Sequence, residues 1–298
     1  MYICIPFFLI LSADRTLLAL SNPLAAKHRH RRADEPVLYL AEADPNEGAF
    51  LAVQADTTCD EPNLVIVTHG WYEREPWPAW MAQAIQRQAD VRQWRCGWYD
   101  WRRQARRLFP SEAAKTARDS AGPLLGRKIL ALSNDWHHIH LIGHSAGSWV
   151  INEAARTIAA QSSASLHLTF LDAYVPNSWD VKALGSLAPD ANCACWAEHY
   201  FTRDAIGTLT ENLLPHAHNI DVTKANPGFN GHKFPWHWYH ATIVGEFATQ
   251  RQFTGARVFD AAGNVRYGFS RARESGEENW ALSVTLQPRT SPVAIDGE

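Results

Sequence analysis

The chain has 298 residues, of which 46% are hydrophobic and 20% are charged, so its composition is that of an ordinary globular protein with a substantial core. The formal net charge of −3 excludes the strongly basic balance that favours nucleic-acid binding, and we expect no nucleic-acid partner. The basic cluster Lys27–Arg32 is interpreted as a solvated linker. The sequence does not determine the oligomeric state.

The beginning of the chain carries a short apolar run, Ile3–Leu11, which is too short to span a bilayer. It resembles the hydrophobic region of a secretory signal, although no lysine or arginine precedes it and the region near Ala25 lacks a clean small-x-small cleavage pattern. We therefore expect residues 1–35 to be a signal segment and basic linker of a secreted or periplasmic protein, with a cytoplasmic location as the alternative.

Four of the five cysteines lie beyond this run, at Cys59, Cys96, Cys193 and Cys195. Their number suffices for two disulfides in an exported protein, and the sequence leaves the pairing open. The spacing of Cys193 and Cys195 suits neither a zinc knuckle nor a redox pair, so neither is expected.

Residues 36–250 alternate between apolar runs of strand length and helical patterns, which predicts one α/β domain whose mostly parallel sheet carries helices on both faces. Residues 251–298 are expected to form a short C-terminal extension. The expected strands are Val37–Ala41, Ala49–Val53, Leu64–Val67, Arg95–Trp101, Ile139–Ile142, Leu166–Leu171, Ala194–Phe201 and His218–Val222. The expected helices are Trp77–Ala89, Ser111–Asn134 with a break or kink at Gly122-Pro123, Ala146–Ala160 and Trp236–Gln250.

The strand at Ile139–Ile142 leads directly into the pentapeptide Gly-His-Ser-Ala-Gly, Gly143–Gly147, and then into a helical pattern. This order is typical of a nucleophile elbow, in which a serine sits on a strained strand-to-helix turn with its hydroxyl exposed. Glycine at both ends of the pentapeptide suits a turn that brings backbone segments together. Ser145 is therefore the candidate nucleophile, and a plain turn that ends a strand is the alternative interpretation.

A serine hydroxyl needs a base to activate it and an acid to orient that base, and an α/β-hydrolase scaffold supplies them in the order Ser, acid, His. Asp172 closes a convincing apolar strand and is preferred as the acid, with Asp204 as the alternative. Either carboxylate could instead be a solvated loop residue or a helix N-cap. A turn-rich loop delivers His232, the candidate base, just before the last predicted helix.

Other histidines compete with His232 for the role of base. His237 and His240 lie within the tryptophan-rich helical stretch, where packing or capping is the simpler role, and His144 belongs to the elbow itself. The histidines show no paired spacing typical of a metal site, so we expect no metal and no cofactor.

The mechanism also needs two donors that point at the oxyanion of a tetrahedral intermediate. The backbone N–H of Ala146, directly after the serine, is one candidate. The loop after the Leu64–Val67 strand supplies the other, and Trp71, which follows His69-Gly70, is the best position.

With these residues in view, the sequence resembles the α/β-hydrolase superfamily, and within it the pancreatic-type lipases, from about Leu64 to about Val244. The resemblance implies an α/β-hydrolase fold and a serine esterase that cleaves small-molecule carboxylic esters through an acyl-enzyme, and it independently favours Asp172 as the acid. It rests on Val67–Trp71, Tyr99–Trp101, Gly143–Gly147, Leu171–Ala173 and the segment of His232, Trp236, Trp238, Tyr239 and Ile243.

The sequence departs from those lipases in two places. Ala146 stands where they usually carry leucine, and only a short loop separates Asp221 from His232, where they often insert a cysteine-bounded lid. A thioesterase or peptidase would use the same three residues. A non-catalytic protein that binds a ligand or partner on a hydrolase fold is the alternative from another class.

Overall fold

The computed structural model describes residues 35–43, 50–55, 59–89, 92–187, 193, 195–203, 209–226, 228–244 and 293–294. The expected signal segment, the basic linker and nearly all of the C-terminal extension lie outside these residues, and so do positions 245–250 of the last expected helix. The expected domain boundaries therefore stay predictions.

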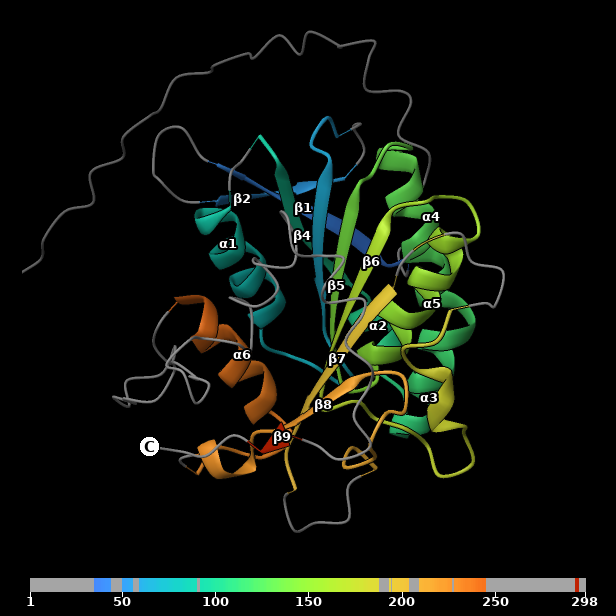
Figure 1. Cartoon of the computed structure of the whole chain (residues 1–298), viewed down its shortest axis with the longest axis vertical. Helices are drawn as coiled ribbons and strands as arrows, with labels where there is room; N and C mark the ends of the chain where they lie inside the picture. The colour runs from blue at the N-terminus through green and yellow to red at the C-terminus, as the bar shows by residue number, and fades with distance from the viewer. Residues whose placement is uncertain are drawn as a thin grey trace, which may run out of the picture. The chain divides into compact units, whose positions relative to one another are not determined.

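One nine-stranded sheet organises the described residues, with the strand order β2-β1-β4-β3-β5-β6-β7-β8-β9 (Figure 1). β1 pairs antiparallel with both β2 and β4, and every other neighbouring pair is parallel. The strands are β1 (Val37–Ala43), β2 (Phe50–Gln54), β3 (Asn63–Thr68), β4 (Trp94–Asp100), β5 (His138–His144), β6 (Ser165–Leu171), β7 (Cys195–Phe201), β8 (His218–Asp221) and β9 (Val293–Ala294).

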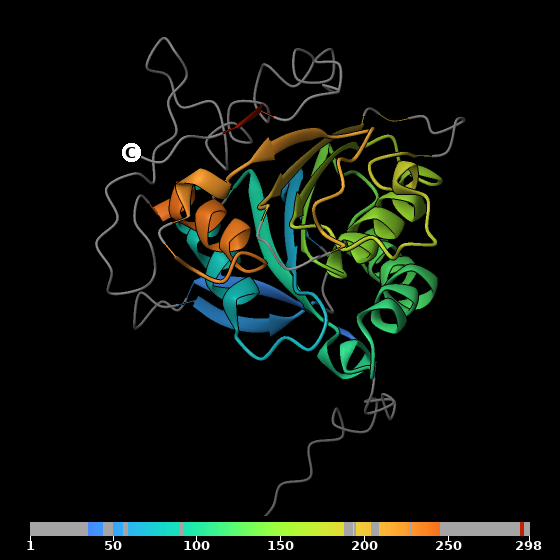
Figure 2. The same cartoon turned by 90° about the horizontal axis from the view of Figure 1, so that it is seen from below.

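Helices cover both faces of this sheet, as Figures 1 and 2 show from two directions. One face carries α1 (Trp77–Gln88) and α6 (Phe234–Val244). The other carries α2 (Arg102–Ala105), α3 (Pro110–Thr116), the turn η2 (Ala117–Ala121), α4 (Gly122–Leu132) and α5 (Gly147–Ala159). The chain thus has the predicted α/β-hydrolase fold, a mostly parallel sheet between two helical layers.

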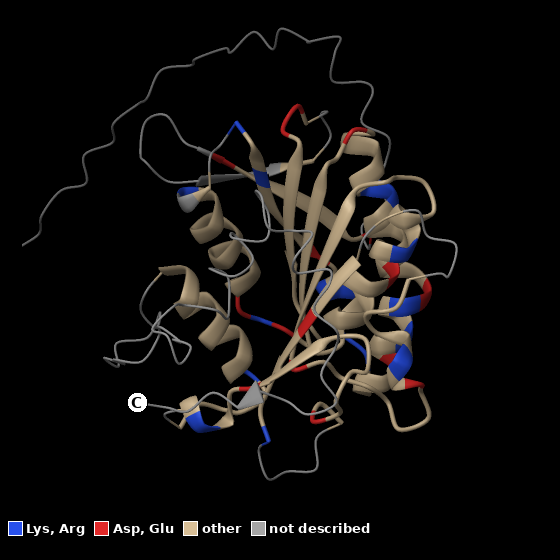
Figure 3. Ribbon diagram, viewed as in Figure 1, with Lys and Arg blue, Asp and Glu red and all other residues tan. Residues whose placement is uncertain are grey.

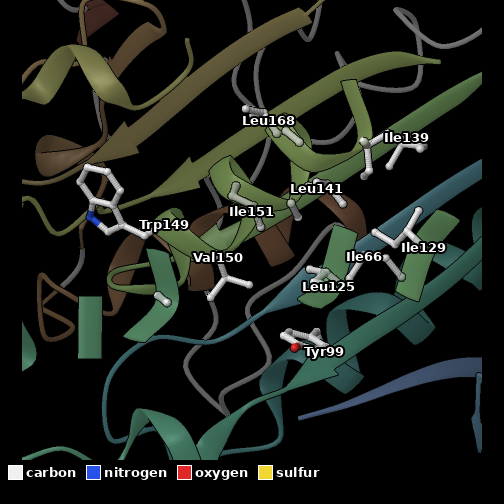
Figure 4. Close-up of a cluster of buried hydrophobic side chains, with 14 of the residues drawn as sticks. Ile66, Tyr99, Leu125, Ile129, Ile139, Leu141, Trp149, Val150, Ile151 and Leu168 are labelled. Carbon is white, nitrogen blue, oxygen red and sulfur yellow. The ribbon is translucent and has the colours of Figure 1, made fainter. Parts of the chain in front are cut away.

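The continuous apolar run of β3 is explained by its place in the middle of the sheet. Leu64 and Ile66 belong to the core under α4 and α5, whereas Val65 and Val67 belong to the core under α1 and α6. Because successive side chains of a strand point to opposite faces, a strand buried on both sides must be apolar at every position. Figure 4 shows part of the first core, where Ile66 lies near side chains from the neighbouring strands and from α4 and α5.

At Gly122-Pro123, where a break or kink was expected, the chain stays helical, but the α-helix is interrupted by a π-helical turn just before Gly122. η2 is a π-helical turn in which the N–H of Gly122 donates to the carbonyl of Ala117, five residues earlier. Proline has no N–H to donate, and it follows at the start of α4, where a helix tolerates it best. The short helix α2 and the pairing of β9 with β8 were not predicted.

The four described cysteines, Cys59, Cys96, Cys193 and Cys195, are free thiols, so the two disulfides considered for an exported protein do not form among them. Burial raises the pKa of Cys59 to about 11 and that of Cys195 to about 12. These two side chains therefore stay protonated at neutral pH and pack as small apolar groups.

Charged side chains lie mainly on the helices and loops and leave most of the central sheet uncharged (Figure 3). Within the part of the chain that the structure describes, no helix combines the length and the apolar character that a bilayer crossing requires.

Candidate active site

Ser145 lies on the sharp turn between β5 and α5, where the sequence predicts the elbow. Its φ is 55°, a left-handed conformation that non-glycine residues rarely adopt. Side chains at the flanking positions would collide with backbone, since a Cβ on Gly143 would lie 2.6 Å from the carbonyl oxygen of Gly147, and one on Gly147 would lie 2.4 Å from that of His69. The glycines therefore have the steric role that the sequence indicates, and the strained serine is the expected signature of a nucleophile elbow.

The structure brings His232 and Asp172 to this serine from positions far along the chain. His232 Nε2 lies 3.0 Å from Ser145 Oγ, and His232 Nδ1 lies 2.6 Å from Asp172 Oδ2. An ionised carboxylate can only accept, so Nδ1–H donates to Asp172 and Nε2 is left to accept the proton of the serine hydroxyl. This tautomer is the one that a general base requires.

Asp172 follows β6 directly and is almost completely buried. Its φ of 49° turns the chain, and its other carboxylate oxygen, Oδ1, accepts from the N–H of Thr202 at 3.1 Å. Burial raises the pKa of this carboxyl, whereas the hydrogen bond from His232 acts in the opposite direction and favours the charged form. The carboxylate is thus fixed at both oxygens.

The two expected oxyanion donors, Trp71 and Ala146, flank the serine. Gly70 packs so closely that a Cβ there would lie 2.7 Å from Ser145 Cβ, which places the start of Trp71 beside the elbow. Neither the N–H of Trp71 nor that of Ala146 donates to another described residue. The two N–H groups therefore meet one requirement of the predicted oxyanion hole, which is that they are not committed to another described acceptor.

A buried carboxylate, which sequence reasoning missed, shapes the loop between Trp71 and α1. Glu73 accepts from the backbone N–H of Arg74 and of Glu75 at 2.8 and 3.0 Å, and from Trp77 Nε1 at 3.0 Å. The same loop is tied to the loop of His232, because Lys233 Nζ lies 2.6 Å from Glu75 Oε1. Both partners of this ion pair are partly exposed, so its contribution to stability is small.

His144 lies beneath the candidate base rather than acting as one. Its Nε2–H donates to the backbone carbonyl of His232 at 2.7 Å, and the two rings are 4.7 Å apart between centroids. Burial, reinforced by nearby His232, holds the pKa of His144 well below its usual range. His144 therefore stays neutral and keeps its donor on the loop that carries His232.

A second pair that sequence reasoning missed supports the acid. His199 Nε2 accepts from the N–H of Ala173 at 3.2 Å, and its Nδ1–H donates to Asn219 Oδ1, 3.1 Å away. Burial lowers the pKa of His199 to about 4, so the ring is neutral and can accept at Nε2. The pair connects β7 and β8 and fixes the backbone directly after Asp172. Its members lie on different strands, so no local sequence pattern announces them.

His237 and His240, the alternative bases that the structure describes, lie outside the hydrogen-bonded series of Asp172, His232 and Ser145. His237 stacks on Trp236 with centroids 3.6 Å apart, and His240 is buried in α6, so both pack as expected. Asp204, the alternative acid, lies outside the described residues, and its exclusion stays a prediction.

A buried group of metal-ligand type lies on three neighbouring strands, at His140, His167 and Glu198. Their candidate ligand atoms all lie within 4.8 Å of one another, and Thr169 Oγ1 is hydrogen-bonded to both His140 and Glu198. The two imidazole rings stack with an interplanar angle of 2°, however. Imidazole nitrogens bind a metal in the plane of the ring, so parallel rings do not aim at a common ion. We interpret the group as polar bracing between strands.

No protein-family model and no curated protein matches the sequence. Among solved structures the chain is similar to esterase 2 of Thermogutta terrifontis phosphorylated by paraoxon, with a TM-score of 0.29 and 14% identity over 55% of this chain and 70% of that one. The butyrate-bound form of the same esterase gives a TM-score of 0.28 and 15% identity over 54% of this chain and 71% of that one. Values this low add no support for a shared activity.

Proposed function

We propose that the chain is a serine hydrolase that cleaves carboxylic esters, with Ser145 as nucleophile, His232 as general base and Asp172 as the orienting acid. The observation that carries the proposal is the unbroken series of hydrogen bonds from the buried carboxylate through the imidazole to the serine hydroxyl, at 2.6 and 3.0 Å. A serine that only ends a turn needs no base beside its hydroxyl. A histidine that only packs in the core needs no serine hydroxyl, held on a strained turn, as its partner.

In the first half of the reaction, Ser145 Oγ attacks the ester carbonyl while His232 Nε2 takes its proton. The carbonyl oxygen becomes an oxyanion that the N–H groups of Trp71 and Ala146 stabilise. When the intermediate collapses, His232 gives its proton to the departing alcohol and the acyl group stays on Ser145. Asp172 remains ionised throughout and stabilises the imidazolium that forms between these steps.

In the second half, water takes the place of the alcohol. His232 removes a proton from the water as its oxygen attacks the acyl-serine, and it returns that proton to Ser145 Oγ as the acid product leaves. His144 stays neutral and adds no second positive charge next to the imidazolium.

The motifs Val67–Trp71 and Gly143–Gly147 support the further proposal that the enzyme is related to pancreatic-type lipases. The short loop before His232 distinguishes it from the members of that family that carry a lid. We therefore propose that the substrates are esters that reach Ser145 without any lid having to open.

The test measures turnover of p-nitrophenyl butyrate by the purified full chain and by Ser145→Ala. We expect the variant to lose at least about 10³-fold in kcat/KM with an unchanged thermal midpoint. Ser148→Ala is the matched control, because its hydroxyl points back to the carbonyl of Gly143 and not to His232. Turnover retained by Ser145→Ala would refute the assignment, and an inactive wild-type chain that still binds esters would favour a binding protein.

A further inference from the structure

Residues 70–76, which join β3 to α1, carry one of the two expected oxyanion donors, the N–H of Trp71. We call this segment the oxyanion loop. A donor of this kind stabilises the transition state most when it already points at the place where charge develops, because turning it during the reaction costs part of the stabilisation. The contacts that hold the oxyanion loop therefore bear on the rate of the proposed reaction.

The strand side of the oxyanion loop is fixed by His69. Its Nδ1 lies 2.9 Å from the carbonyl oxygen of Gly70, which can only accept, so Nδ1 carries a proton and donates it. The Gly70 carbonyl and the Trp71 N–H belong to one planar trans peptide group and point in opposite directions, so this contact also sets the direction of the N–H. Trp101 holds His69 in turn, with its backbone N–H 3.2 Å from Nε2 and its Nε1 donating to the His69 carbonyl at 2.8 Å.

The residue after the expected donor has a conformation that its side chain disfavours. Tyr72 has a φ of 54°, in the left-handed region that bulky non-glycine residues rarely adopt. Its ring is exposed, so packing in the core does not hold it there. Such conformations persist only where the surrounding structure determines them. Hydrogen bonds on the far side of Tyr72 are the contacts that remain to hold the loop in this shape.

Glu73 makes those hydrogen bonds. Its Oε1 accepts from the N–H of Arg74 and of Glu75 at 2.8 and 3.0 Å, and its Oε2 accepts from Trp77 Nε1 at 3.0 Å. Glu73 is buried and forms no ion pair with a described residue, so these three donors offset the cost of burying its charge. Because the carboxylate is held where all three donors reach it, it fixes the backbone from Tyr72 to the first turn of α1.

Trp77 connects this carboxylate to the half of the site that carries the base. The indole is completely buried, stacks on Trp236 with centroids 5.0 Å apart, and meets the ring of His144 edge-on at 5.9 Å. His144 in turn donates to the carbonyl of His232. Glu73 therefore joins the oxyanion loop to the packed side chains that support the base.

We propose that Glu73 is a positioning residue, which keeps Tyr72 in its left-handed conformation and so holds the N–H of Trp71 in place for the oxyanion before a substrate binds. The effect on rate rests on the proposed function, whereas the hold on the loop does not. Glu73 acts through Trp71 and takes no part in proton transfer. A carboxylate that only stabilised the fold would change the thermal midpoint without selectively changing the affinity for an oxyanion.

The test compares Glu73→Gln with the matched control Glu75→Gln, which alters a partly exposed carboxylate of the same loop that pairs with Lys233. Glutamine keeps the volume of Glu73 and an oxygen acceptor for the two backbone N–H groups, but it turns an NH₂ group toward Trp77 Nε1, which has a proton of its own. With p-nitrophenyl butyrate we expect Glu73→Gln to lower kcat about 30-fold, less than the loss of a whole oxyanion donor, and to change KM by less than about threefold. Glu75→Gln should stay within about twofold of the unsubstituted chain in both constants.

A trifluoromethyl ketone reads the oxyanion hole directly. Ser145 Oγ adds to its carbonyl, His232 takes the hydroxyl proton, and the adduct carries an oxyanion. The inhibition constant should rise in Glu73→Gln by about the factor by which kcat falls, since both depend on the stabilised oxyanion. The reasoning about Tyr72 adds a rescue, because asparagine accepts left-handed backbone more readily than tyrosine. Glu73→Gln with Tyr72→Asn should recover at least about threefold in kcat over Glu73→Gln alone.

Amide hydrogen exchange measures the hold on the loop without any substrate. In the unsubstituted chain, the N–H groups of Arg74 and Glu75 should exchange at least about 100-fold more slowly than in an unstructured peptide. The peptide that covers the oxyanion loop should exchange at least about tenfold faster in Glu73→Gln, and at an unchanged rate in Glu75→Gln.

Four results would overturn the proposal. They are equal kcat in Glu73→Gln and Glu75→Gln, a fall in kcat without a matching loss of ketone affinity, no recovery with Tyr72→Asn, and unprotected amides at Arg74 and Glu75 in the unsubstituted chain. The last of these needs no variant to fold. Faster exchange of the loop in Glu73→Gln, in a chain that hydrolyses no ester, would leave the hold on the loop standing and refute the proposed function alone.

Discussion

Replacing Asp172 with asparagine separates the role of the carboxylate from its shape. Asparagine tolerates the left-handed conformation at this position better than other residues do, so the φ of 49° is kept. The N–H of Thr202 donates to Asp172 Oδ1 and so needs an acceptor there. The amide oxygen of the asparagine would take that place, and its NH₂ group would face His232 Nδ1. The imidazole would then carry its proton on Nε2 and could not accept the proton of Ser145 Oγ.

The expected loss in kcat/KM for p-nitrophenyl butyrate is about 10³- to 10⁴-fold, which corresponds to about 4–5.5 kcal/mol of transition-state stabilisation. The thermal midpoint should change little, because the substitution preserves volume and hydrogen-bond count. Asp204→Asn, the rival acid, should keep kcat/KM within about threefold. A much larger loss for Asp204→Asn than for Asp172→Asn would show that the acid has been assigned wrongly.

Three further changes probe the surroundings of the site. Gly70→Ala would place a methyl 2.7 Å from the Cβ of the nucleophile, so the oxyanion loop must move by roughly 1 Å, and kcat/KM should fall about 100-fold in a folded protein. His144→Phe removes the donor to the carbonyl of His232 and should lower kcat/KM about tenfold, whereas His144→Gln, which retains a donor, should recover part of it. Burial lowers the folded-state pKa of His138 to about 3 and that of His199 to about 4, so below pH 6.5 the unfolded chain binds more protons and stability is lost as the pH falls. Each of these two histidines should cost about 2 kcal/mol between pH 7 and pH 5, as measured by urea unfolding.

Each of these expectations has a result that contradicts it. Wild-type kcat/KM in Gly70→Ala would mean that the loop does not supply an oxyanion donor. Equal activity of the phenylalanine and glutamine variants of His144 would mean that its hydrogen bond does not position the base. An unfolding free energy that is the same at pH 7 and pH 5 would show that the buried histidines are not neutral in the folded protein.

Much of the layout could be predicted from the sequence, because local patterns specify it. Strand, glycine turn and helix place Ser145 without reference to the rest of the chain. Asp172 and His232 could be chosen because the acid closes an apolar strand, the histidine follows a turn-rich loop, and an α/β-hydrolase scaffold takes them in the chain order Ser, acid, His. The alternating apolar runs likewise predicted eight of the nine strands, since burial on both faces leaves a continuous apolar signature.

What sequence reasoning missed depends on contacts between distant residues. His199 with Asn219 and the group around Glu198 are assembled by strand register, which no local pattern encodes. Glu73 looks like any loop carboxylate until the loop folds over it. β9 has only two residues, too few for a periodic pattern. The helical course through Gly122-Pro123 was missed because the switch to π-helical hydrogen bonding before Gly122 leaves no mark in an α-helical sequence pattern.

The central claim is that Ser145 is a nucleophile activated by His232 and oriented through Asp172. The most direct measurement is reaction of the full chain with a fluorophosphonate, followed by peptide mass spectrometry to locate the adduct. We predict one adduct per chain, on Ser145, with labelling of His232→Ala slowed by at least about 10²-fold. An unlabelled Ser145 in folded protein, or labelling at an equal rate without the imidazole, would contradict the claim.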